Sequence, residues 1–334
     1  MQVLAGDIGG TNTRLCITET DGRHHQTYIE CRYASGDHAD LAAIVRRFMA
    51  DVGSHIREMP GLACFAVAGA VEVTPAGETA RITNLPWVVS SQVLSKEFGF
   101  RHVRVINDFQ AVGYGIEGLG SGGLAALQEG TAVAGGPRAV LGAGTGLGQT
   151  VLVWQGDHYE ALPTEGGHVS FAPTSPLQDE LLTFLRARHG RVSCERLISG
   201  PGLVAIYEFL RSQGDVTESP AVAGSLRAGD PGAAISTAAL EKNDALANAA
   251  LNLFIEIYGA HAGDLALTIG ASGGVYVAGG IAAKILPRLR EGIFTRAFND
   301  KGRMRRLTEA MPVSVVTADT VGLIGAALAA ARMN

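Results

Sequence analysis

Two glycine-rich segments, Gly6–Thr11 and Gly142–Gly148, each follow an apolar run typical of a β-strand. Because glycine has no Cβ, its backbone tolerates φ > 0, and its N–H groups can approach a phosphate closely. Thr11 and Thr145 add a hydroxyl donor to each segment. One such turn is weak evidence in a chain with 44 glycines among 334 residues, but two at corresponding strand ends indicate a clamp for nucleotide phosphates.

Asp7 lies inside the first glycine-rich segment, where its negative charge cannot contact phosphate directly. A carboxylate in this place is typical of a residue that holds Mg²⁺ through water, since Mg²⁺ binds carboxylates and keeps much of its hydration. The sequence therefore predicts ATP with Mg²⁺ as the cofactor, the metal being held mainly by the nucleotide and water without a dedicated protein site.

Asp108 is the strongest candidate for a catalytic residue. It follows the apolar run Val103–Ile106 and begins a helical segment, so its carboxylate projects from a rigid element near helix N–H groups. The alternative is a helix N-cap, a role that Asp often fills. Its neighbour Asn107 and the polar residues described next favour the catalytic interpretation.

Further polar residues occur at expected strand ends and helix starts. Asparagine, carboxylate and imidazole groups can together donate to and accept from the hydroxyls of a sugar. His168 taken alone is more typical of a buried structural histidine, and the Asn84–Trp87 loop fits either a substrate-facing loop or a packed Pro-Trp turn. The candidates for contacts to a polyhydroxylated ligand are Asn84, Asn107, Asp108, Glu165, His168 and Glu195.

Strand-like and helix-like segments alternate along the chain, which predicts an α/β fold. The segments 3–18 and 139–154 each show the pattern of a strand, a glycine-rich turn and a second strand. This similarity suggests that one architecture is used twice. The Gly/Ala-rich stretch 118–137 is the expected domain boundary. We expect 214–230 to be an exposed connection, and 319–331 to form a closely packed helix of small residues.

Composition excludes several classes of protein. The chain has 27 basic and 32 acidic residues, a net charge of −5, so neither nucleic acid nor an anionic membrane surface is an expected partner. Its most apolar C-terminal stretch is much shorter than the ~20 residues of a membrane span. The four scattered cysteines form no metal-binding pattern, and no secretory signal is visible. The expected location is the cytoplasm.

The motifs together resemble bacterial ATP-dependent glucokinases, which belong to the hexokinase and actin-like ATPase superfamily. The resemblance extends over nearly the whole chain and keeps the order of the motifs. It is carried by Gly6–Asn12, Asn107–Asp108, Gly142–Gly148, Glu165–His168, Glu195 and Gly279–Gly280. The related ROK sugar kinases carry a cysteine-rich zinc motif after the Glu-x-Gly-His segment, where this chain has only Cys194. The resemblance is therefore to the zinc-free glucokinase branch, and no set of protein residues that ligate a metal directly is expected.

The resemblance implies a two-domain actin-like ATPase fold, also called ribonuclease H-like, with a cleft between a small and a large domain. The small domain would comprise residues 1–118 and 318–334, and the large domain residues 119–317. Asp108 would be the base, and the sugar contacts would fall on the candidates named above. The implied nucleotide-binding residues are Gly6, Asp7, Ile8, Gly9, Gly10, Thr11, Gly144, Thr145, Gly146, Gly279 and Gly280.

The implied reaction is transfer of the γ-phosphoryl group of ATP to the 6-hydroxyl of D-glucose. Asp108 would accept the hydroxyl proton, while the turns and Mg²⁺ neutralise charge in a loose transition state. Two alternatives remain open at this point: a kinase for mannose, fructose or N-acetylglucosamine, and a non-catalytic sugar-responsive regulator. A homodimer is the expected oligomeric state.

Overall fold

The computed structural model describes residues 1–53, 58, 60–214, 216–241 and 244–333. These residues divide into two compact units. The N-terminal unit comprises Met1–Gly123, Tyr159–Pro163 and Ala318–Asn334, and the central unit comprises Leu124–His158 and Thr164–Thr317.

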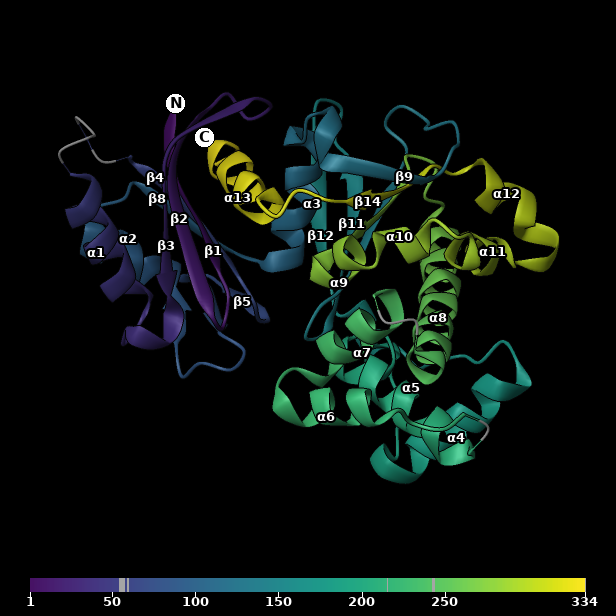
Figure 1. The fold of residues 1–334 in the computed structure, drawn as a ribbon. Coiled ribbons are helices and arrows are strands. Elements are labelled where there is room, and N and C mark those ends of the chain that lie inside the picture. Colours follow the sequence, from purple (N-terminus) through teal and green to yellow (C-terminus); the bar gives the residue numbers. More distant parts are fainter. Residues whose placement is uncertain (54–57, 59, 215, 242–243, 334) are drawn as a thin grey trace. The chain divides into compact units, whose positions relative to one another are not determined.

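A mixed sheet in the order β3-β2-β1-β4-β8 forms the centre of the N-terminal unit (Figure 1). β1 pairs antiparallel with β2 and parallel with β4, and β4 pairs parallel with β8. The carboxyl ends of β1 and β8 therefore point the same way, which brings Asp7 and Asn107 to the same edge. The strands are β1 (Gln2–Ile8), β2 (Asn12–Thr20), β3 (His25–Ala34), β4 (Leu62–Val67) and β8 (His102–Asn107).

Helices cover both faces of this sheet (Figure 1). α1 (Leu41–Val52) buries Leu41, Ile44, Val45 and Phe48 at helical spacing, and the Asp40 side chain caps it by accepting the Ala43 N–H at 2.7 Å. The unit also contains α2 (Ser91–Phe98), α3 (Asp108–Gly118), α13 (Val321–Ala331) and the three-stranded sheet β5 (Val71–Thr74), β6 (Gly77–Arg81) and β7 (Val88–Ser90).

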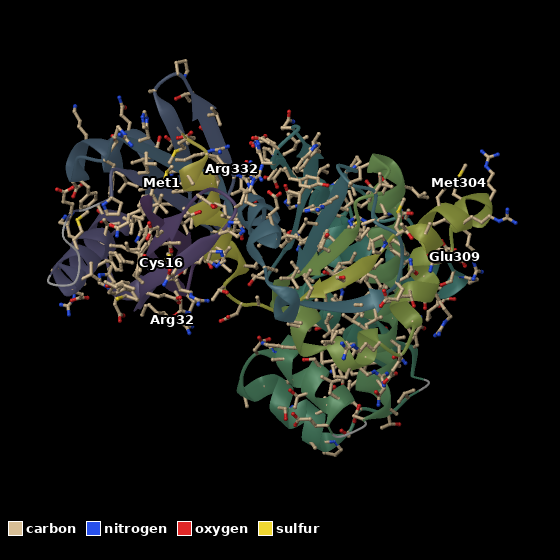
Figure 2. The ribbon with its side chains drawn as sticks, turned by 90° about the horizontal axis from the view of Figure 1, so that it is seen from above. Met1, Cys16, Arg32, Met304, Glu309 and Arg332 are labelled. Atoms are coloured by element: carbon tan, nitrogen blue, oxygen red, sulfur yellow. The ribbon has the colours of Figure 1, made fainter. Side chains whose placement is uncertain are left out.

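α3 and α13 approach closely because glycine stands at their contact. A Cβ at Gly325 would overlap the Ala111 carbonyl, and one at Gly115 would overlap the Val321 carbonyl. Arg332, just beyond α13 (Figure 2), donates to Glu117 on α3 at 2.7 Å and to the Tyr159 carbonyl at 2.9 Å. The small-residue stripe of the C-terminal helix thus positions the helix that begins at Asp108.

The central unit repeats the strand arrangement of the N-terminal unit. Its order β11-β10-β13-β14 corresponds to β2-β1-β4-β8, with the same antiparallel first pair and parallel later pairs, and this confirms one architecture used twice. β9 extends the sheet beyond β14. The strands are β9 (Leu124–Gln128), β10 (Arg138–Ala143), β11 (Leu147–Trp154), β13 (Val275–Ala278) and β14 (Val313–Val316), while β12 (Tyr159–Thr164) belongs almost wholly to the N-terminal unit.

The helices of the central unit form its large apolar core with β10 and β13. The longest of them buries one side along most of its length and ends at Gly270, which has φ +61°. The helices are α4 (Pro176–His189), α5 (Gly200–Gln213), α6 (Pro220–Ala228), α7 (Pro231–Leu240), α8 (Ala245–Ile269), α9 (Gly279–Lys284), α10 (Leu286–Leu289), α11 (Ile293–Asn299) and α12 (Arg305–Ala310).

The expectation that 214–230 is only an exposed connection is wrong for most of its described residues. Helix α6 occupies Pro220–Ala228 and buries Val222. Ser219 accepts the Val222 N–H at 3.4 Å as the N-cap, and Pro220 takes the first helical position, where its missing N–H costs nothing. The serine and proline that suggested a loop are the start signal of this helix.

Candidate active site

The first phosphate turn is shorter than the sequence suggests. β1 continues to Ile8, so Gly6 and Ile8 are buried strand residues, and a Cβ at Gly6 would lie 2.8 Å from Leu15 and Phe65. The turn itself consists of Gly9, Gly10 and Thr11, closed by the Gly9 N–H donating to Asn12 at 2.9 Å. It is the hairpin connection between β1 and β2.

Asp7 and Asp108 form a pair of carboxylates in the N-terminal unit. Asp7 lies near the end of β1 opposite Arg14 on β2, and Asp108 is the first residue of α3. Burial, followed by the negative charge of Asp7, raises the pKa of Asp108 to about 6. Burial also raises the pKa of Asp7, against the opposing effect of Arg14. A carboxylate with a pKa near neutrality can accept and release a proton under working conditions.

Asn107, and not Asp108, is the N-cap of α3. Its Oδ1 accepts the Phe109 N–H at 2.9 Å, and its Nδ2 donates to the Gly69 carbonyl at 3.1 Å. Gln110 completes a capping box by accepting the Asn107 N–H at 3.2 Å. Asp108 Oδ1 also accepts the Phe109 N–H, at 3.0 Å, so Asp108 adds to the hydrogen bonds at the helix start while Asn107 and Gln110 form the capping box. The Asn107 side chain also hydrogen-bonds the Asp108 carboxylate, which acts to lower the pKa of Asp108 against the effect of burial. One lone pair of the Asn107 Oδ1 remains for another partner.

The Asn84–Trp87 loop combines the two interpretations that the sequence left open. Trp87 is buried in the core, and the Ile82 N–H donates to its carbonyl at 3.2 Å. Asn84 is exposed and adopts φ +65°, a left-handed conformation that asparagine tolerates better than most residues. Asn84 lies close to Gly10, because its Cβ is 3.7 Å from the position that a Cβ on Gly10 would occupy. The packed half of the loop thus holds the exposed amide beside the first phosphate turn.

The second phosphate turn joins β10 to β11 in the central unit. Gly144 donates to the Gly146 carbonyl at 2.8 Å, and its own carbonyl accepts the Gly200 N–H from the start of α5 at 2.8 Å. Thr145 is exposed at the tip. At the strand before the turn, the Ala143 N–H donates to the Tyr258 hydroxyl of α8 at 3.1 Å. The turn is therefore anchored to two helices.

Three of the predicted sugar contacts come together in the central unit. His168 lies 3.9 Å from a Glu165 oxygen through Nε2, and 3.8 Å from a Glu195 oxygen through Nδ1. Glu195 also accepts the Leu147 N–H at 3.0 Å, which joins it to the second phosphate turn. The Glu165 and His168 side chains are 70% and 57% exposed, so their hydrogen-bonding atoms are free to meet a ligand.

A cavity of about 830 Å³ adjoins the second phosphate turn within the central unit. Apolar residues from α5, α7 and α9 line much of it together with polar and charged side chains, and a cofactor site likewise combines apolar walls with placed polar groups. Gly280 faces the cavity, whereas Gly279, at φ +85°, packs on the Ala143 carbonyl. Polar lining residues that sequence reasoning missed include Arg196, Asp230 and Lys284.

The sequence pattern that defines the glucokinase family matches residues 4–333 of the chain. The chain belongs to the glucokinase family. It is 47% identical to the glucokinase of Nostoc punctiforme, over 99% of both chains. The enzyme therefore phosphorylates glucose with ATP, and the fold prediction and the resemblance that accompanied it are confirmed.

Solved structures give the same fold. The glucokinase from an Antarctic psychrotroph superposes with a TM-score of 0.85, at 34% identity and 99% coverage of both chains. A ROK family glucokinase from Streptomyces griseus, solved with glucose and AMPPNP, is 21% identical with a TM-score of 0.64, covering 99% of this chain and 100% of that one. At that identity the second likeness concerns the fold alone.

No group of three or more His, Cys, Asp or Glu side chains among the described residues is arranged to hold a metal ion. No helix that the structure describes combines the length and apolarity needed to cross a membrane. All four cysteines are free, and burial raises the pKa of the Cys64 and Cys194 thiols to about 12.

Proposed function

We propose that Asp108 is the general base that accepts the proton of the glucose 6-hydroxyl as its oxygen attacks the γ-phosphorus of ATP. The observation that carries this role is a carboxylate at the start of α3 whose pKa is raised to about 6 while Asn107 serves as the helix cap. The new P–O bond forms as the bond to the ADP oxygen breaks. Positioning and charge neutralisation supply most of the rate, because the transition state is loose.

Glu165, His168 and Glu195 bind the sugar in this proposal, with Asn84 and Asn107 contributing from the N-terminal unit. Each carboxylate accepts hydroxyl hydrogens, and the imidazole between them can donate or accept. The 3.8 and 3.9 Å separations from His168 leave these groups only loosely engaged with one another. Sugar hydroxyls would replace these contacts with shorter hydrogen bonds.

The cavity beside Gly144 takes the adenosine part of ATP, and the two glycine turns hold its phosphates. The Gly9 and Gly144 N–H groups close their own turns, so Gly10 with Thr11 and Thr145 with Gly146 would supply the backbone N–H groups and hydroxyls. Asp7 lies beside the first turn. Gly280 leaves room for the nucleoside, because no atom lies within 4 Å of the place its Cβ would take. Gly279 serves the same site by seating α9 against β10.

Mg²⁺ fits the residues at the first turn. The carboxylate of Asp7 is desolvated, and no hydrogen bond reaches it from the described residues, so a cation would satisfy it. Mg²⁺ usually binds through one or two carboxylates together with water and substrate phosphates. Asp7 would hold the metal through water, and the metal would neutralise charge on the transferring phosphoryl group.

The two half-sites lie on different units, so phosphoryl transfer requires them to close on the substrates. We propose a small domain of residues 1–118 and 318–334 and a large domain of residues 119–317, with glucose bound in a cleft between them. Closure would exclude water, whose attack on ATP is the competing reaction. We further propose that the protein is cytoplasmic, since ATP and reduced thiols are characteristic of that compartment. We propose a homodimer because twofold-symmetric dimers are the commonest soluble oligomers.

Glucose-dependent ADP release, followed in a coupled assay across a panel of hexoses, tests the function. We expect the highest kcat/KM with glucose and lower values with mannose, fructose and N-acetylglucosamine, because single hydroxyl contacts decide selectivity. A higher kcat/KM with another hexose would reassign the substrate. ADP release that does not respond to any sugar would contradict the proposed sugar site.

A further inference from the structure

We infer that His261 is a positioning residue for glucose recognition. His261 holds Gln149 of β11, and Gln149 in turn positions the turn that carries Glu165 and His168. The inference deepens the proposed function and rests on the sugar-binding role of that turn. His261 lies on α8 and is separated from Gln149 by 112 residues in the sequence, so only the fold brings them together.

Gln149 lies directly beneath the turn. Its side chain is only 4% exposed, and its Oε1 is aimed at Gly166, where any Cβ would overlap it. Its backbone carbonyl accepts the Thr164 hydroxyl at 3.2 Å, and the same hydroxyl accepts the Gly166 N–H at 3.2 Å. Gly167 is packed equally closely on the Leu147 carbonyl. The position of the turn is therefore set by β11, and by Gln149 in particular.

His261 fixes the far end of the Gln149 amide. Gln149 Nε2 is hydrogen-bonded to His261 Nε2. An amide nitrogen can only donate, so the imidazole nitrogen must accept, and the ring carries its proton on Nδ1. Burial favours this neutral form by lowering the pKa of His261, as does Lys301, while Asp264 acts in the opposite direction. Asp264 and Lys301 form an ion pair of 2.7 Å, in which the Lys301 side chain is buried and the Asp264 side chain is exposed.

The same helix supports both halves of the central site. Tyr258 lies one turn before His261 on α8, and its hydroxyl accepts the Ala143 N–H at the second phosphate turn. Positions three residues apart share one helix face. From that face of α8, Tyr258 contacts the strand before the second phosphate turn, and His261 contacts the glutamine beneath the turn that carries Glu165 and His168. The two supports contact different strands, which allows their effects on ATP and glucose to be separated.

The test compares His261→Phe with His261→Gln and Gln149→Leu in the intact enzyme. His261→Phe removes the acceptor and keeps a ring, so we expect the KM for glucose to rise about 10-fold or more, because small misplacement of a contacting group can cost up to ~100-fold. The KM for ATP should change less than about 2-fold. His261→Gln restores an acceptor at similar reach and should recover most of the glucose affinity.

A double-mutant cycle adds a readout that a merely structural role would not produce. If His261 acts through Gln149, the double variant should have a glucose KM close to that of Gln149→Leu alone. Additive effects, or equal changes in the KM values for glucose and ATP, would overturn the inference.

Glu165→Gln, measured in parallel, separates this inference from the proposed sugar site. A raised glucose KM in Glu165→Gln with no change in the His261 and Gln149 variants would refute the positioning role alone. No change in Glu165→Gln would refute the sugar-binding role of the turn, and the inference with it. Circular dichroism of each variant identifies any that fails to fold. If either His261→Phe or Gln149→Leu fails to fold, the glucose KM of the other one decides.

Discussion

At the scale of single residues, the proposed chemistry depends most on the Asp108 carboxylate. Asp108→Asn keeps the shape of the side chain but removes the proton acceptor, so kcat should fall by ~10²–10⁴-fold while glucose still binds. Asp40→Asn is the control, because Asp40 is the N-cap of α1 in the N-terminal unit, lies at a helix start like Asp108, and asparagine caps as well as aspartate. Steady-state kinetics and glucose titration calorimetry measure both. Near-normal turnover in Asp108→Asn would exclude the base assignment.

The raised pKa of Asp108 also predicts two pH effects of opposite sense. As a base, Asp108 works when ionised, so kcat should decline as pH falls through about 6. The free energy of unfolding changes in the opposite direction. The pKa of Asp108 in the folded state exceeds the ordinary 3.8, so the stability that the protonated carboxyl contributes at low pH is lost as pH rises through about 6. Since one pKa unit corresponds to about 1.4 kcal/mol, Asp108→Asn should be more stable than the parent by up to about 3 kcal/mol at pH 8.

Urea denaturation at pH 8 and pH 5 measures the stability effect, and the advantage of Asp108→Asn should shrink at the lower pH. The rate effect is measured as the acid limb of the kcat profile. An acid limb near pH 4 together with no stability difference would show that Asp108 is well solvated in solution. That result would contradict the burial on which the base assignment rests.

At the scale of elements, the second phosphate turn offers a test of nucleotide binding. Apart from the two chain neighbours of Gly144, no atom of the described residues lies within 4 Å of the position that a Cβ would take there, so Gly144→Val should fold normally. The added side chain would enter the cavity and block backbone approach to phosphate, so the KM for ATP should rise about 10-fold or more with little change in glucose binding. Gly224→Val, in the open on α6, is the control. Loss of glucose affinity with ATP affinity unchanged would assign the turn to the sugar.

The α3–α13 contact predicts a coupling between the C-terminal helix and Asp108, the proposed base. A methyl group at Gly325 has no space against the Ala111 carbonyl, so Gly325→Ala should destabilise the fold by at least the ~1–3 kcal/mol typical of overpacking. Because α3 begins at Asp108, kcat should fall as well. Gly36→Ala, at an open position of the same unit, is the control. Unfolding by urea that is unchanged in Gly325→Ala would mean that the helices can separate without cost.

Local signals predicted many of these elements, and their limits have physical causes. The two hairpin turns, the strand before Asp108 and the duplicated sheet follow from short-range patterns of glycine and apolar residues. The cap assignment could not be made, since Asn107 and Asp108 are both good caps and the choice depends on Gly69 and Gln110. The Gln149–His261 pair had no local signal, because its hydrogen bond spans 112 residues.

At the scale of the whole molecule, the division of the half-sites between two units makes ligand-driven closure the central expectation. Asp108 and the first turn belong to the N-terminal unit, and Glu165, His168 and the second turn belong to the central unit. A direct transfer needs the glucose oxygen and the γ-phosphorus in contact, so ligands that bind both units must favour the closed form by their differential affinity. Glucose should therefore reduce the radius of gyration in small-angle scattering.

Adding a non-hydrolysable ATP analogue to the glucose complex should keep the enzyme compact, while the analogue alone should have less effect if sugar contacts drive closure. Glu165→Gln with His168→Asn, which weakens the sugar contacts of the central unit, should need more glucose to reach the same compaction. Asp108→Asn should close normally, since it removes the proposed base and keeps a hydrogen-bonding side chain. An unchanged scattering profile at saturating glucose would rule out closure by the sugar and would leave the nucleotide, or both substrates together, as the ligand that joins the two half-sites.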